Sequence, residues 1–366
     1  MSGVSRPGPG VAVDGARAGD GAPARGATAG DAPARDGAPA RDGAVRDGGV
    51  RSGAIPDFFI VGQPKSGTTA LYETLRAHPQ IYMPAGKEPW FFAEELHERT
   101  PPRPEGTPET LEQYLALFEQ ARPGQRLGEA TALYLWSRTA AARIAQVQPA
   151  ARIVAILREP AGLLRSLHLQ FLQSYVETEA DLGRALALER ERRAGRSIPA
   201  HTYWPKALLY SEHVRYVEQL RRYHEVFAPE QVLVLIYDDF RADNRGVVRE
   251  VLRFLAVDPD TPLEVPRANP TVQPRSQRLH ELVHALTVGR GAGARALKGA
   301  IKSVTPRGLR RGALHLAQRR LVFAEPRAAD EQLMRELRSR YKPEVLALSE
   351  YLGRDLVSLW GYEHVE

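Results

Sequence analysis

The sequence predicts an α/β fold in which helices flank a doubly wound sheet of about five parallel strands. Two patterns predict it: short apolar runs bounded by turn residues, which are typical of buried parallel strands, and helical periodicity between them. The apolar runs are Phe58–Gly62, Ile81–Met83, Leu127–Glu129, Arg152–Leu157 and Val232–Tyr237. The helical segments are Thr69–Ala77, Leu111–Glu119, Thr139–Val147, Leu163–Val176 and Ser211–Val226. Since ligands in such folds bind at the carboxyl ends of the strands, we expect functional residues there.

The chain changes in composition near residue 55. Residues 1–54 are mainly Gly, Ala, Arg, Asp and Pro, and a short unit recurs as Ala34–Ala38, Ala40–Ala44 and Val45–Gly48. Such a segment buries too little apolar surface to offset the entropy lost on ordering. We therefore predict a disordered low-complexity tail over 1–54 and a single domain over 55–366. Acidic and basic residues nearly cancel in the tail, so we predict no nucleic-acid binding.

Composition also narrows the chemistry and the location. The 366 residues include no cysteine, which excludes disulfides, thiolate metal sites and cysteine nucleophiles. No run approaches the roughly 18 apolar residues that a membrane helix needs, and the N-terminus lacks the apolar core of a secretory signal. These features predict a cytoplasmic location.

Positive charge is concentrated in one stretch near the C-terminus. Between Arg290 and Arg327 ten basic residues accompany one acidic residue, whereas the rest of the chain carries 40 basic and 43 acidic residues. Leu297, Ile301 and Val304 recur among them at helical spacing. Three interpretations of 290–327 stay open: a lid that draws in an acidic partner, a helix in peripheral contact with a membrane, and a solvated helix.

Two further segments have helical periodicity. Residues 181–196 are heavily charged with leucines at helical spacing, which predicts an exposed helix. Residues 326–362 are expected to close the domain with Leu356, Leu359 and Trp360.

The first predicted strand leads into a loop of small residues and then directly into a helix. Such a loop is the usual cradle for a phosphate, because backbone N–H groups and the helix N-terminus point into it. We therefore predict a P-loop-like fold. The residues expected to bind a phosphorylated small molecule are Lys65, Ser66, Gly67, Thr68 and Thr69.

The position of the lysine separates this loop from a Walker A loop. Gly62 and Gly67 have the Walker spacing, but Thr68 stands at the lysine position and Lys65 lies three residues earlier. A lysine in mid-loop lies beside the phosphate that the loop itself binds. That suits a nucleotide with one 5′-phosphate and a transferable group attached to it.

The segment Pro64–Thr69 resembles the 5′-phosphosulfate loop of sulfotransferases that use 3′-phosphoadenosine-5′-phosphosulfate (PAPS). The resemblance covers most of residues 57–362 and is closer to the heparan-sulfate-type and bacterial branch than to the phenol and steroid branch. It implies that PAPS is the co-substrate, that residues 65–69 hold its 5′-phosphosulfate, and that Lys65 stabilises the leaving oxygen. This chemistry requires no metal.

Sulfuryl transfer also needs a base that takes the acceptor's proton. The segment Lys87–Phe92 follows the second predicted strand and resembles the segment that holds the catalytic glutamate of glycan sulfotransferases. The resemblance assigns that role to Glu88. Phe91 and Phe92 are expected to pack in the core.

A third group follows the strand Arg152–Leu157. Arg158 ends this strand, and Ser166 comes eight residues later on the next predicted helix. Arginine offers a fork of donors to a phosphate. The resemblance implies that Arg158 and Ser166 bind the 3′-phosphate, which distinguishes PAPS from ATP.

Residues 128–134 resemble a family segment with one informative departure. Ala130 stands where the family often has a lysine, so a second lysine near the sulfate is missing. Either Lys65 acts alone or Lys87 substitutes. Glu129 and Tyr134 are left open between a structural and a substrate-facing role.

Two further residues are candidates for the site. Tyr210 lies in a segment that resembles one near the family's nucleotide site, so we expect it to help shape that site. His168 lies on the same predicted helix as Ser166 and is a candidate for the acceptor cleft.

The sequence thus predicts in-line transfer of a sulfuryl group from PAPS to a hydroxyl or amine of a glycan, lipid or small-molecule acceptor. One alternative is a P-loop nucleotide kinase or nucleotidase, with Asp238 and Asp239 near Mg²⁺. The other is a non-catalytic protein that binds nucleotides or polyanions through the basic stretch. The oligomeric state is not predicted.

Overall fold

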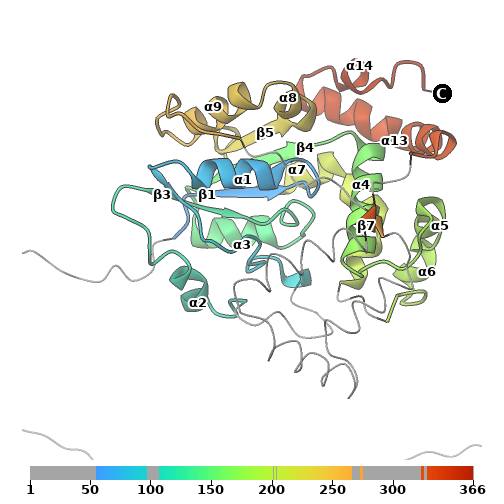
Figure 1. Ribbon diagram of the computed structural model, residues 1–366, viewed down its shortest axis with the longest axis horizontal. Coiled ribbons are helices and arrows are strands. Elements are labelled where there is room, and N and C mark those ends of the chain that lie inside the picture. Colours follow the sequence, from blue (N-terminus) through green and yellow to red (C-terminus); the bar gives the residue numbers. More distant parts are fainter. Residues whose placement is uncertain are drawn as a thin grey trace, which may run out of the picture. The chain divides into compact units, whose positions relative to one another are not determined.

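In the computed structural model, five parallel strands form one sheet in the order β2-β3-β1-β4-β5 (Figure 1). They are β1 (Phe58–Gly62), β2 (Ile81–Tyr82), β3 (Arg126–Ala130), β4 (Arg152–Leu157) and β5 (Val232–Ile236). The chain leaves β1 toward one edge of the sheet and leaves β4 toward the other. This is the doubly wound pattern, whose ligand crevice lies at the carboxyl ends of the central strands. The predicted fold class is confirmed.

The structure describes residues 55–96, 107–200, 202, 204–265, 273–274, 323–324 and 328–365. The predicted tail over 1–54 lies outside these residues. So does the basic stretch 290–327, apart from residues 323–324. Its interpretation as a lid, a membrane-contacting helix or a solvated helix stays a prediction.

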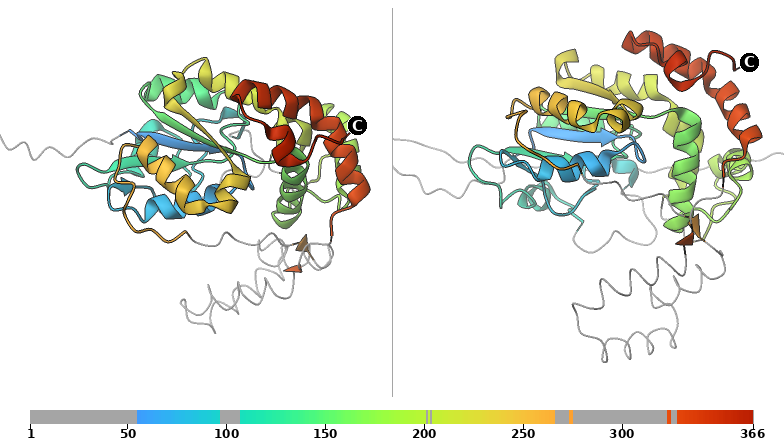
Figure 2. Two further views of the ribbon diagram at one scale, coloured as in Figure 1. Left: turned by 90° about the horizontal axis from the view of Figure 1, so that it is seen from above. Right: turned by 45° about the horizontal axis from the view of Figure 1, so that its top comes forward.

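Helices cover both faces of the sheet. One face carries α1 (Thr68–Arg76), α8 (Tyr237–Ala242) and α9 (Asn244–Phe254), and the other carries α3 (Ala140–Val147), α4 (Pro160–Gln173), α7 (Tyr216–His224), α13 (Glu331–Leu352) and α14 (Leu356–Trp360) (Figure 2). Within β1, Phe58 and Ile60 pack against the first group, while Phe59 and Val61 pack against the second. Because both faces are buried, the strands read as continuous apolar runs rather than as an alternating pattern.

Shorter elements complete the described part of the chain. The α-helices are α2 (Leu111–Ala116), α5 (Leu182–Ala187) and α6 (Glu189–Arg193), and the 3₁₀ turns are η1 (Glu94–Leu96), η2 (Pro205–Leu208), η3 (Tyr210–Val214) and η4 (Pro229–Gln231). A separate antiparallel pair joins β6 (Gln273–Pro274) to β7 (Phe323–Ala324). Among the described helices, none combines the length and the apolar character needed to cross a membrane.

Three predicted boundaries shift for local reasons. Helix α4 begins at Pro160 rather than at residue 163, because proline suits the first helical position and the Glu159 carboxylate accepts from the N–H groups of Ala161 and Gly162. Strand β5 ends one residue early because Tyr237 already begins α8. The segment predicted as one helix over 211–226 divides into η3 and α7.

The prediction of one exposed helix over 181–196 is wrong, because the segment is neither a single helix nor fully exposed. The segment forms two short helices, α5 and α6, and one side of it is buried. The buried Arg192 guanidinium donates to both carboxylate oxygens of Glu177, at 2.7 and 2.9 Å. A bidentate pair of this kind satisfies two charges that could not otherwise be buried. The many charged residues of this segment are therefore not all exposed.

The C-terminal helices close the second face of the sheet. Helix α13 packs against α4 and α7, and Leu356 and Trp360 of α14 are buried, as predicted. Leu359 was expected to be buried with them, but it is 42% exposed. The buried stripe of this short helix contains Leu356 and Trp360, and Leu359 lies outside it.

The contact between β1 and β3 gives a test of the fold. Gly128 lies opposite Phe58 in the parallel register, and a Cβ atom added at Gly128 would overlap the Phe58 ring. Since Phe58 is fully buried, its ring cannot move toward the solvent to relieve the overlap. We expect Gly128→Ala to lower the free energy of unfolding by about 1–3 kcal/mol, measured by urea denaturation.

The matched control is Gly86→Ala, because a Cβ atom at Gly86 would meet nothing within 4 Å. This variant is expected to unfold at the wild-type urea concentration or slightly above it. Equal stability of the two variants would contradict the close packing of β1 on β3.

Candidate active site

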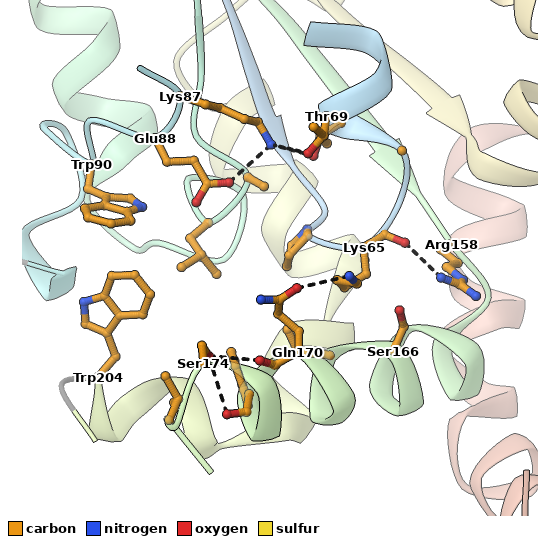
Figure 3. Close-up of a pocket in the computed structure, with 18 of the residues that line it drawn as sticks. Lys65, Thr69, Lys87, Glu88, Trp90, Arg158, Ser166, Gln170, Ser174 and Trp204 are labelled. Carbon is orange, nitrogen blue, oxygen red and sulfur yellow. Dashed lines mark hydrogen bonds and ion pairs between the residues drawn. The ribbon is translucent and has the colours of Figure 1, made fainter. Parts of the chain in front are cut away.

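A cavity of about 400 Å³ lies at the carboxyl ends of the strands (Figure 3). All five strands contribute to it, because lining residues follow each of them within a few positions. Seven of the predicted site residues line it: Lys65, Gly67, Thr68, Thr69, Glu88, Arg158 and Ser166. Ser66 and Tyr210 are not among its lining residues. The fold therefore brings together groups that are up to about a hundred positions apart in the sequence.

The phosphate loop connects β1 to α1 through two residues in the left-handed region. Lys65 has φ 65° and Gly67 has φ 88°. A Cβ atom at Gly67 would lie 2.9 Å from the Phe240 ring, so both the conformation and the space favour glycine. No side chain caps the N-terminus of α1. Its first N–H groups are thus available to an anion at the loop.

Ser66 is buried beneath this loop rather than facing the cavity. Its side chain is wholly inaccessible, and its hydroxyl donates to the Pro64 carbonyl oxygen at 3.5 Å. The Ser66 side chain, predicted to bind the phosphate, therefore does not reach the cavity. The side chains of Thr68 and Thr69, in contrast, line the cavity.

Lys65 lies in mid-cavity among other cations. Its ammonium donates to Oε1 of Gln170 at 3.1 Å. Partial burial lowers the pKa of Lys65, and the positive charges of Arg158 and Lys87 lower it further. This cluster of cations favours the binding of an anion, which would relieve the repulsion between them.

Arg158 connects the end of β4 to the phosphate loop. Its Nη1 donates to the Lys65 carbonyl oxygen at 2.9 Å. Its guanidinium also lies over the Tyr237 ring, 4.8 Å from the centroid. These two contacts hold the guanidinium at one end of the cavity.

Ser166 lies at the same end of the cavity as Arg158 (Figure 3). The Ser166 side chain is 5% exposed, and its hydroxyl has no hydrogen-bond partner among the described residues. A buried hydroxyl without a partner costs free energy, so its retention points to a partner that is supplied by a ligand.

Lys87 and Glu88 reach the cavity from the segment after β2. The Lys87 ammonium donates to Oγ1 of Thr68 and of Thr69, each at 3.2 Å, and lies 3.3 Å from Oε1 of Glu88. The backbone N–H of Glu88 donates to the Ala130 carbonyl oxygen at 3.0 Å, which ties this segment to the end of β3. The possibility that Lys87 replaces the lysine missing at Ala130 thus has a geometric basis.

Glu129 and Tyr134 belong to the core rather than to the cavity. The Glu129 carboxylate accepts from the hydroxyls of Tyr114 at 2.7 Å, Thr131 at 2.6 Å and Tyr134 at 3.3 Å. Burial raises the pKa of Glu129 to about 7, although these hydrogen bonds act in the opposite direction. Phe91 and Phe92 pack on Tyr114, as expected for core residues.

Tyr210 and His168 lie behind the cavity wall. The Tyr210 hydroxyl donates to Glu177 at 3.1 Å, and its ring packs against His168 and Phe171. His168 is 3% exposed, and its Nε2 bonds the Glu179 carbonyl oxygen at 2.8 Å. Burial lowers the pKa of His168. Phe171, which contacts the Tyr210 ring, does line the cavity.

Several residues that line the cavity were not predicted from the sequence. Gln170 and Ser174 lie four and eight positions after Ser166, so they share its face of α4 and the helical period could have identified them. Trp90 lies within the segment Lys87–Phe92, which was expected to supply only Glu88 to the site. Trp204 lies in a segment without any local signal and reaches the cavity only through the tertiary fold.

Asp238 and Asp239, which the kinase alternative would place near Mg²⁺, form hydrogen bonds with residues outside the cavity. Asp239 accepts from both terminal nitrogens of Arg354, at 2.6 and 2.7 Å, and Asp238 accepts from Trp360 Nε1 at 3.0 Å. Neither aspartate lines the cavity. Within the described residues no group of three His, Asp or Glu side chains is placed to hold a metal ion.

Comparisons with known proteins identify the family of this chain. A model of the Sulfotransferase family matches residues 56–261, which include every lining residue of the cavity. Carbohydrate sulfotransferase 15 of Mus musculus is 27% identical over 262 residues, covering 57% of this chain and 45% of that protein. Heparan sulfate glucosamine 3-O-sulfotransferase 3B1 of Mus musculus is 27% identical over 209 residues, covering 57% of this chain and 48% of that protein.

The chain thus spans about half the length of the curated relatives it matches. Among solved structures, a sulfotransferase from Alicyclobacillus acidocaldarius has a TM-score of 0.58 and 26% sequence identity, covering 83% of this chain and 98% of that chain. The family model alone matches more than half of the chain, and the fold agrees with it. This chain therefore belongs to the sulfotransferase family.

Proposed function

We propose that the protein transfers a sulfuryl group from PAPS to a hydroxyl or amine of an acceptor. One observation carries the proposal: the phosphate loop, Glu88 and the pair Arg158 and Ser166 all line one cavity. A loop that binds a 5′-phosphate, a base and an independent anion site are the three parts that this reaction needs.

The side chains at the two anion sites fit this donor. The N–H groups at the start of α1 and the cations around Lys65 suit the 5′-phosphosulfate. At the other site, Arg158 offers a guanidinium, and Ser166 offers a buried hydroxyl that no described residue engages. Together these two groups suit a phosphate monoester such as the 3′-phosphate.

The residues around the transferred group have separate tasks. The donor supplies a sulfuryl group whose bond to a phosphate oxygen breaks as its bond to the acceptor oxygen forms. Glu88 accepts the proton that the acceptor hydroxyl loses. Lys65 balances the negative charge that remains on the leaving oxygen, and Lys87 adds a second positive charge through its position on Thr68 and Thr69.

The names of the relatives give a first indication of the acceptor class. The relatives named above act on a carbohydrate and on heparan sulfate glucosamine by their names. For this chain we propose a glycan, lipid or small-molecule acceptor. The cytoplasmic location inferred from the sequence stays a prediction.

Nucleotide binding is the first test. We expect Ser166→Ala to weaken binding of 3′-phosphoadenosine-5′-phosphate (PAP) by about tenfold or more, because a hydrogen bond to a charged group contributes roughly 1.5–3 kcal/mol. Arg158→Ala should weaken it at least as much. ADP affinity should not change in Ser166→Ala, since ADP lacks the 3′-phosphate. Isothermal titration with PAP and with ADP measures both affinities.

Arg165→Ala is the control, because Arg165 lies on the same helix but is not among the lining residues. Ser166→Ala should also unfold like the wild type, since no protein hydrogen bond is lost. Equal affinity of the wild type for PAP and ADP, or a preference for ADP with Mg²⁺, would overturn the PAPS assignment.

The base is tested by an isosteric change. Glu88→Gln keeps the shape of the side chain but cannot accept the acceptor's proton, so we expect turnover of PAPS to PAP to fall by about 10²–10⁴-fold. PAP affinity should remain within about twofold of the wild type. Turnover is followed by chromatography of PAP in the presence of a mixed acceptor panel. Retention of wild-type turnover would exclude Glu88 as the base.

The position of Lys87 leads to a rescue experiment. Lys87→Ala removes a cation from the phosphate loop and should lower PAPS turnover by about 10–100-fold. Adding Ala130→Lys to this variant restores a lysine where the family often has one, and we expect part of the activity to return. Lys206→Ala serves as the control, since Lys206 is exposed and does not line the cavity. Unchanged turnover in Lys87→Ala would assign the charge stabilisation to Lys65 alone.

A further inference from the structure

The two ends of the cavity differ in chemistry. Arg158 and Ser166 lie at one end, and Trp90 and Trp204 lie at the other, with Glu88 near the tryptophans (Figure 3). The proposed nucleotide contacts occupy the first end and the middle. The tryptophan end is therefore the part of the cavity that remains for an acceptor.

The two tryptophans form one apolar wall. Their ring centroids are 4.9 Å apart and their planes meet at 82°, an edge-to-face contact. Both side chains are half-buried and pack against the core on the face of the sheet that carries α4 and α7. Leu133, Phe171 and Val176 also line the cavity and belong to that core. The Thr202 hydroxyl donates to the Val176 carbonyl oxygen, which holds the segment before Trp204 against this wall.

The backbone is strained where it presents this wall. Glu88 has φ 65° and Trp90 has φ 55°, which is rare for residues with a side chain and rarest for bulky ones. Strain of this kind is concentrated at functional sites. Glu88 and Trp90 line the same cavity.

Charge at this end disfavours an acidic acceptor. Among the described lining residues the cations are Lys65, Lys87 and Arg158, and each of them contacts the phosphate loop. The phosphates and the sulfate of the donor would neutralise these cations. The charged lining group near the tryptophans is Glu88, whose Oε1 lies 3.3 Å from the Lys87 ammonium. A carboxylated or sulfated acceptor would thus meet the Glu88 carboxylate, and Lys87, the cation beside it, is already engaged by Glu88 and by the phosphate loop.

We propose that the acceptor is an uncharged ring compound that lays an apolar face on Trp90 and Trp204 and directs a hydroxyl to Glu88. This inference rests on the proposed function and specifies its substrate class. Two kinds of compound share this chemistry: aromatic rings and the C–H faces of neutral sugars. Large aromatic side chains with a few convergent polar groups are the usual lining for ligands of this type.

The test uses binding, so that no acceptor need be known. The protein is saturated with PAP and titrated calorimetrically with two matched pairs of probes. 2-Naphthol is compared with 6-hydroxy-2-naphthoate, and cellobiose with cellobiouronic acid; within each pair the second compound carries a carboxylate. We expect at least one neutral probe to bind about tenfold more tightly than its acidic counterpart. The pair that shows this distinguishes an aromatic acceptor from a sugar acceptor.

Variants then assign the binding to the tryptophan wall. Trp90→Ala and Trp204→Ala should each weaken the neutral probe by about tenfold, with PAP affinity unchanged. Trp136→Ala is the matched control, because Trp136 is also half-buried but stacks on His213 outside this cavity. Trp204→Phe, which keeps an aromatic ring, should retain most of the affinity.

Each contrary result has a definite meaning. Preference for the acidic probes, no binding of either neutral probe, or an equal loss in Trp136→Ala overturns the assignment. Failure of the proposed function itself would appear earlier, as loss of the 3′-phosphate requirement for PAP binding. Normal PAP binding combined with a preference for acidic probes would therefore reject the acceptor class and leave the donor site intact.

Discussion

The parallel pairing of β1 with β3 on one side and β4 on the other is the constraint on which the site depends. Parallel strands end at the same edge of a sheet, so this pairing brings the phosphate loop, the segment after β3 and Arg158 to one place. Arg158 strengthens the arrangement, because its guanidinium donates to the carbonyl oxygen of Lys65. The end of β4 thereby helps to fix the conformation of the loop that follows β1.

The cavity combines unfavourable electrostatics with backbone strain. Lys65, Lys87 and Arg158 repel one another, which contributes to the lowered pKa of Lys65. Lys65 and Glu88 also hold left-handed backbone conformations. An anion bound at the loop would favour the charged form of Lys65 and reduce the repulsion. Relief of this repulsion between the cations would thus favour the binding of an anion at the loop.

Buried polar pairs support this site without entering it. Glu129 is held by three hydroxyls at the end of β3, next to the residue that receives the N–H of Glu88. Glu177 joins Arg192 and Tyr210 behind α4, the helix that carries Ser166 and Gln170 into the cavity. These networks are fully satisfied, so they can fix the orientation of cavity walls instead of leaving buried charges unpaired.

The sequence by itself determined the five strands, the phosphate loop and the residues that end β4, because these features depend on local patterns. Apolar runs, turn residues and the spacing from Gly62 to Gly67 can be read within short segments. It could not place side chains whose surroundings come from distant elements. Tyr210 was expected at the nucleotide but is bonded to Glu177, and the charged segment 181–196 proved partly buried through Arg192. Only the tertiary structure decided that Lys87 lies on Thr68 and Thr69 and that Trp204 meets Trp90. These contacts join residues from separate loops, and their geometry follows from how the sheet and α4 pack rather than from any spacing along the chain.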